Sequence, residues 1–89
     1  MRAHVFIYGD VIGVGFRSWT VQNAKELGLA GWVRNAALKT VEAVFEGPKQ
    51  KIEKMIEKCR KGPEVSYVEK VEVKWEEVAN EFAGFEVRY

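Results

Sequence analysis

The stretch "GDVIGVGFRSWT" (9–20) holds the residue types in this chain that are best able to do chemistry. Gly9, Gly13 and Gly15 allow a positive φ and a close approach of the backbone to a ligand. Successive amide N–H groups in such a loop can converge on one anion, and the N-terminus of a following helix adds positive partial charge there. Arg17 adds a planar fork of donors that suits phosphate or carboxylate. The stretch therefore predicts a small-anion site, with phosphate as the favoured occupant.

Two other kinds of phosphate-binding loop do not fit this stretch. A loop of the type G-x-x-x-x-G-K-[ST] needs four residues between its glycines and then Lys-Ser/Thr, and the segment from Gly9 to Gly13 offers neither. The dinucleotide fingerprint G-x-G-x-x-G fails at Ser18, where a third glycine is required. A tight strand-to-helix turn that binds nothing stays open, because a glycine-rich turn alone does not distinguish the two.

The patterns on both sides of the loop indicate the elements that must position it. Alternating apolar residues indicate strands, and an i, i+3, i+4 spacing indicates helices. The expected elements are a strand at 3–8, a helix at 18–29 with Ser18 as its N-cap, strands at 31–35 and 40–47, a helix at 48–61 with the apolar stripe Ile52, Met55, Ile56 and Cys59, and strands at 66–75 and 85–89. Two helices on one face of a mostly antiparallel sheet make an α+β, ferredoxin-like α/β sandwich, βαββαβ plus a short C-terminal strand. We expect one domain over 1–89.

The composition limits the class of protein. The chain has 89 residues and a formal net charge of +1, whereas a dedicated nucleic-acid binder usually carries a strong basic excess. Its one cysteine, Cys59, excludes an internal disulfide and favours a reducing compartment. No apolar run is long enough for a signal peptide or a bilayer span. We therefore expect a cytoplasmic protein without a nucleic-acid or membrane partner.

The loop and a second motif together resemble the acylphosphatase family. "VIGVGFR" (11–17) is similar to the family's loop, V-Q-G-V-x-F-R, and "GWVRN" (31–35) is similar to its second motif, G-[WY]-V-x-N. "EGP" (46–48), "KGP" (61–63) and "GFEVRY" (84–89) also resemble family segments, so the resemblance covers essentially the whole chain. It implies a ferredoxin-like fold and hydrolysis of the carboxyl–phosphate bond of acyl phosphates.

The resemblance implies a role for each part of the site. Arg17 matches the family's phosphate-binding arginine, and Asn35 matches the asparagine that positions the attacking water. The acyl phosphate is the small-molecule partner, and we expect a monomer that needs no metal or cofactor. The segment whose amides would cradle the phosphoryl oxygens comprises Asp10, Val11, Ile12, Gly13, Val14, Gly15 and Phe16.

Two departures from the family's loop leave a second function open. Ile12 stands where the family usually has glutamine, and Asp10 adds a negative charge near the loop mouth. We expect reduced rather than abolished activity, because the cradle uses backbone groups. The alternative is a catalytically weak or inactive domain that binds phosphate or another small anion. An RNA-binding module of the same fold is disfavoured, because "TVEAVFEG" (40–47) lacks the aromatic RNA-recognition pattern.

Three further features carry smaller expectations. The connection "NAALKT" (35–40) lacks the glycine turn typical of the family, so we expect a longer or less regular hairpin. Trp32 is expected to be a packing residue, with a place in the pocket wall beside Asn35 as the alternative. A carboxylate at Tyr89, the last residue of the sequence, is hypothesised to orient Arg17.

Overall fold

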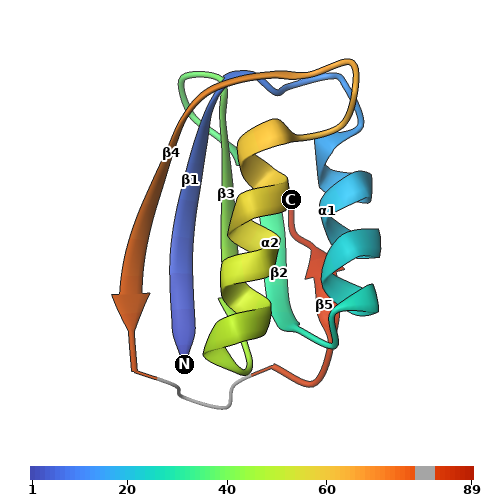
Figure 1. Cartoon of the computed structure of the whole chain (residues 1–89). Helices are drawn as coiled ribbons and strands as arrows, with labels where there is room; N and C mark the ends of the chain where they lie inside the picture. The colour runs from blue at the N-terminus through green and yellow to red at the C-terminus, as the bar shows by residue number, and fades with distance from the viewer. Residues whose placement is uncertain (78–81) are drawn as a thin grey trace.

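The computed structural model of the chain describes residues 1–77 and 82–89. Both helices of this part lie on one face of a five-stranded sheet, with the strand order β4-β1-β3-β2-β5 (Figure 1). Neighbouring strands are antiparallel except for the parallel pair β2 and β5. This arrangement confirms the ferredoxin-like α+β sandwich. The elements are β1 (Arg2–Asp10), α1 (Phe16–Glu26), β2 (Ala30–Ala36), β3 (Thr40–Glu46), α2 (Lys49–Lys61), β4 (Tyr67–Glu76) and β5 (Phe85–Val87).

The core lies between the helices and the sheet. The apolar stripe predicted for α2 is confirmed, because its four residues are all buried against the sheet. Burial raises the pKa of the Cys59 thiol to about 12, so this cysteine fills space in the core and is no nucleophile at neutral pH. In the described residues, neither helix is long and apolar enough to cross a membrane.

Helix α1 begins earlier than its sequence pattern predicts. Ser18 was expected to be the N-cap, but the N-cap is Gly15, in the left-handed conformation with φ 77°, and no side chain caps the helix. The expectation is wrong because Phe16 is a buried core residue, which pulls the first turn of the helix toward the sheet. As a result Arg17 and Ser18 both lie in the first turn of α1.

The hairpin between β2 and β3 is short, but its backbone is less regular than a glycine turn. Ala36 pairs with Thr40, so residues 37–39 make the connection. Leu38 and Lys39 both adopt left-handed conformations, with φ of 58° and 54°. Each costs about 1 kcal/mol in a residue with a Cβ atom. The hairpin nevertheless keeps the register that sets Asn35 opposite Val41.

The sheet face away from the helices, here called the far face, carries a cluster of ion pairs. Arg34 Nε donates to Glu42 Oε1 at 2.7 Å, and His4 Nε2 lies 2.6 Å from Glu42 Oε2. Burial by itself would raise the pKa of Glu42, but the hydrogen bonds from Arg34 and His4 outweigh it and hold that pKa below its ordinary value. Because Arg34 is tied to the far face, its neighbour Asn35 points to the helix side of the sheet.

Replacing Glu42 with glutamine is expected to lower the free energy of unfolding by about 1–2 kcal/mol near neutral pH, because two partly buried hydrogen bonds lose their charged acceptor. A carboxyl whose pKa is lower in the folded state stabilises the fold above its unfolded pKa, and that contribution disappears as the pH falls through the folded value. The difference between the native chain and Glu42→Gln should therefore shrink below about pH 4.5. Urea titrations of both proteins at pH 6.5 and pH 3 measure this difference in the free energy of unfolding.

The matched control is Glu86→Gln, because Glu86 is exposed and lies 3.8 Å from Arg88. An exposed pair contributes little, so this variant should match the native chain at both pH values. A stability difference for Glu42→Gln that is equal at pH 6.5 and pH 3 would show that the carboxylate charge is not what stabilises this face.

Candidate active site

The loop between β1 and α1 is anchored at both ends by buried side chains. Val11 and Phe16 are each 1% exposed and belong to the core. Between them, Gly13 and Gly15 have φ of 75° and 77°, a conformation that residues with a Cβ rarely adopt. A Cβ at either glycine would meet no heavy atom within 4 Å, so backbone conformation, and not crowding, is the reason for glycine here.

The backbone N–H groups of this loop are free to bind a ligand. Within residues 1–77 and 82–89, the N–H groups of residues 12–18 donate no hydrogen bond, and the first donor of α1 is Trp19, to Gly15 O at 3.0 Å. Positive φ at Gly13 and Gly15 alternates with negative φ at Val14 and Phe16. Alternating signs of φ are the backbone pattern of nests, in which consecutive N–H groups converge and can bind an anion, and a helix N-terminus carries partial positive charge.

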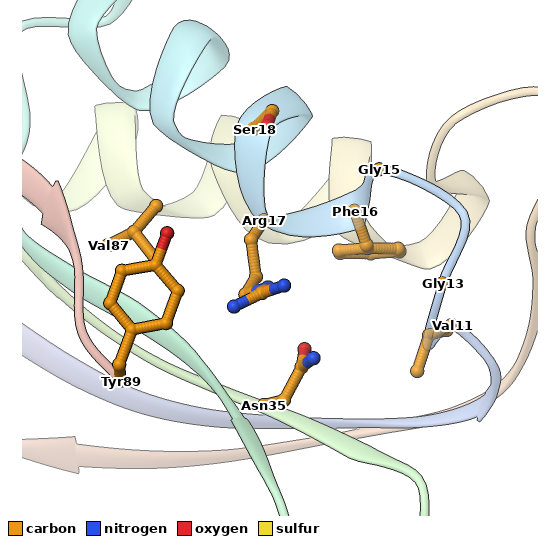
Figure 2. Close-up of a pocket in the computed structure, with 9 residues that line it drawn as sticks. All are labelled: Val11, Gly13, Gly15, Phe16, Arg17, Ser18, Asn35, Val87 and Tyr89. Atoms are coloured by element: carbon orange, nitrogen blue, oxygen red, sulfur yellow. The ribbon is translucent and has the colours of Figure 1, made fainter.

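A pocket of about 110 Å³ lies beside this loop (Figure 2). Figure 2 shows the guanidinium of Arg17 and the amide of Asn35 extending into the same space, one from α1 and the other from β2. No carboxylate side chain is among the described residues that line it, and Arg17 is the cationic side chain among them. The lining residues are Val11, Gly13, Gly15, Phe16, Arg17, Ser18, Asn35, Val87 and Tyr89.

Arg17 is available to a ligand. With the described residues it forms no ion pair or hydrogen bond, and its guanidinium carbon lies 5.3 Å from the centre of the Tyr89 ring. This contact is a cation–π interaction, worth about 0.5–1 kcal/mol at an exposed site. The structure therefore places the Tyr89 ring, and not a carboxylate, against Arg17. All five donors of the guanidinium remain for an anion.

The pocket gathers most of the residues singled out from the sequence, but not all of them. Asp10 is exposed at the end of β1, and Ile12 and Val14 pack partly buried against the core, so these three side chains lie outside the pocket lining. Gly9 is part of β1, where a Cβ would come within 2.2 Å of Tyr67 O on β4. Glycine is needed here because β1 and β4 approach too closely at this point for a side chain.

Sequence reasoning missed Val87 in the pocket wall and placed Tyr89 near Arg17 only through its carboxylate. Val87 and Tyr89 reach the site because β5 pairs in parallel with β2, and no local pattern reveals that pairing. Their alternation with Phe85 was the available signal, since it places all three on one side of a strand. Trp32 does not line the pocket; it is buried on the far face between the guanidinium groups of Arg34 and Arg88, 5.2 and 5.0 Å from its ring centre.

Comparisons with known proteins agree with this geometry. Residues 3–87 match the family model described as Acylphosphatase. An acylphosphatase of Syntrophobacter fumaroxidans is 50% identical over 99% of this chain and 91% of its own length, and one of Pyrobaculum aerophilum is 49% identical over 97% and 92%. The crystal structure of acylphosphatase from Bacillus subtilis superposes with a TM-score of 0.95 at 30% identity, over 99% of this chain and 98% of that one. The chain therefore belongs to the acylphosphatase family of hydrolases.

Proposed function

We propose that this chain hydrolyses the carboxyl–phosphate bond of acyl phosphates, releasing a carboxylate and inorganic phosphate. The amides of residues 12–18 and the guanidinium of Arg17 hold the phosphoryl group, and Asn35 orients the attacking water. The observation that carries the proposal is the loop itself: consecutive N–H groups without a described acceptor lie beside a pocket into which one unpaired guanidinium extends.

The leaving group explains why so few side chains are needed. The carboxylate that departs is the conjugate base of an acid with a pKa of about 4, so it leaves without a general acid. The phosphoryl group passes through a loose transition state with negative charge spread over its oxygens. Donors fixed in advance around those oxygens stabilise that charge without reorganising. A nest and one guanidinium supply these donors.

Asn35 supplies the remaining requirement, an oriented water. Its side chain is exposed and forms no hydrogen bond with a described residue, so both of its polar atoms are available. The amide oxygen accepts a hydrogen bond from the water, which turns a lone pair of the water toward phosphorus. Because neither Arg17 nor Asn35 transfers a proton in this proposal, the reaction needs no titrating side chain.

The two residues that depart from the family's loop, Ile12 and Asp10, do not affect the proposed binding of the phosphoryl group. The side chains of Ile12 and Asp10 are not part of the pocket lining, so neither stands between the amides and a bound phosphoryl group. These two residues therefore give no reason to expect a domain that binds phosphate without hydrolysing the substrate. In our proposal the substrate is a small-molecule acyl phosphate in the cytoplasm, a compartment compatible with the single buried thiol of Cys59.

The test is hydrolysis of benzoyl phosphate in the presence of EDTA. We expect turnover to be unchanged by EDTA, because the donors named above replace the charge that a metal would supply. We expect kcat/KM to vary by less than about 3-fold from pH 5 to pH 8, since no essential group titrates there. Activity that requires added Mg²⁺, or a rate that follows a histidine-like titration, would contradict the mechanism.

A further inference from the structure

Two pocket residues have no part in holding the phosphoryl group. Val87 lies in β5 and Tyr89 follows that strand, and Figure 2 shows both on the opposite side of Arg17 from the loop residues Gly13 and Gly15. Their side chains carry apolar surface, whereas the loop side offers N–H donors. The pocket therefore has a polar side, formed by the loop, and an apolar side, formed by the end of the chain.

The two sides of the pocket suit the two parts of an acyl phosphate. The loop amides and the guanidinium of Arg17 are the donors that suit phosphoryl oxygens, so in the proposed function the phosphoryl group occupies the loop side. The acyl group then extends past Arg17 to the apolar side of the same pocket, where Val87 and Tyr89 lie.

The backbone that leads to Tyr89 is fixed by strand pairing, although the residue itself is exposed. The N–H of Arg88 donates to Val33 O at 2.8 Å, which continues the pairing of β5 with β2, and the guanidinium of Arg88 stacks over Trp32 on the far face. Tyr89 therefore projects to the pocket side, where its ring meets Arg17. The residue is nonetheless 99% exposed, so most of the ring surface is open to a ligand.

We propose that Tyr89 is a specificity-determining residue, whose ring packs against the acyl group and favours acyl phosphates with a planar aromatic acyl group over acetyl phosphate. This inference rests on the proposed function, since it assumes that the phosphoryl group occupies the loop. An offset-stacked or edge-to-face contact between two aromatic rings favours the aromatic ligand by about 3- to 10-fold in affinity. Val87 extends the same apolar wall.

Binding of two unreactive analogues tests the proposal without turnover. Phenacylphosphonate and acetonylphosphonate carry a CH₂ group in place of the bridging oxygen of benzoyl and acetyl phosphate, so neither can be hydrolysed at that position. Calorimetry should show phenacylphosphonate binding about 3- to 10-fold more tightly to the native chain. That preference should vanish in Tyr89→Ala and persist in Tyr89→Phe. The matched control, Tyr67→Ala, removes an exposed tyrosine of β4 and should keep the preference.

Kinetics separate this inference from the function on which it rests. The ratio of kcat/KM for benzoyl phosphate to that for acetyl phosphate should fall in Tyr89→Ala by the same factor as the binding preference. Loss of the contact with Arg17 slows both substrates alike, so the ratio isolates the acyl group. Hydrolysis of neither substrate by the native chain would refute the proposed function, while the analogues still decide the role of Tyr89. An equal preference in the native chain and in Tyr89→Ala would overturn the inference.

Discussion

Replacing Arg17 with alanine is expected to lower kcat/KM for benzoyl phosphate by about 10³- to 10⁵-fold, the range that an arginine supplies to a phosphoryl-transfer transition state. Arg17 is the one cation that lines the pocket in the described chain, and no described carboxylate competes for it. Its loss removes both ground-state affinity and transition-state charge stabilisation. The affinity for inorganic phosphate should therefore fall along with the rate, and calorimetry with phosphate measures that part separately.

Two further variants show whether the effect belongs to the guanidinium. Arg17→Lys keeps the charge but not the planar fork, so we expect it to recover only part of the phosphate affinity. Arg60→Ala is the matched control, because Arg60 lies on α2 with its Nε 3.5 Å from Glu57 Oε1 and half of its side chain exposed. It should behave as the native chain does. If Arg17→Ala bound phosphate within about 3-fold of the native chain, the anion site would have to be elsewhere.

The stability of Arg17→Ala should change little. The described contact of the side chain is the Tyr89 ring, and an exposed cation–π pair contributes about 0.5–1 kcal/mol. For a domain of this size that corresponds to a shift of the midpoint of thermal unfolding of about 2–8 °C. A larger loss would mean that Arg17 supports the fold, and the kinetic effect would then report damage to the structure.

The local part of the site could be predicted from the sequence because it depends on local chemistry. Gly13 and Gly15 precede a helix, and together with Arg17 that order predicted a small-anion loop, although a turn that binds nothing stayed open. The fold also followed from periodicity, since strand and helix patterns alternate in the order the structure shows. Ser18 misled the prediction of the helix start, because capping preferences are weaker than the burial of Phe16.

The rest of the site depends on contacts between distant segments. The parallel pairing of β5 with β2 sets Val87 beside Val33 and so carries Tyr89 to Arg17, and alternation within the last strand does not reveal its partner. The sequence also did not settle which side of the sheet each residue of β2 faces. Trp32 was expected to be a packing residue, and its stacking on the far face excludes the alternative place in the pocket wall.

Replacing Asn35 with alanine is expected to lower kcat by about 10²- to 10³-fold, the usual effect of removing one oriented group from a transition state. KM for benzoyl phosphate should change by less than about 3-fold, because in our proposal the amide contacts the water and not the phosphoryl oxygens. Steady-state kinetics measure both constants. Asn23→Ala is the matched control: its amide donates to Trp19 O at 2.8 Å within α1, away from the pocket lining, so kcat should be retained.

The two substitutions together test whether Arg17 and Asn35 have separate roles, one in binding phosphate and the other in the rate of hydrolysis. Arg17→Ala should lower both phosphate affinity and rate, whereas Asn35→Ala should lower the rate and leave phosphate affinity near that of the native chain. This contrast follows from the proposed roles, in which the guanidinium holds the phosphoryl group from α1 and the amide of Asn35 orients the water from β2. If Asn35→Ala instead raised KM and kept kcat, Asn35 would be a phosphate ligand, and the attacking water would need another residue to orient it.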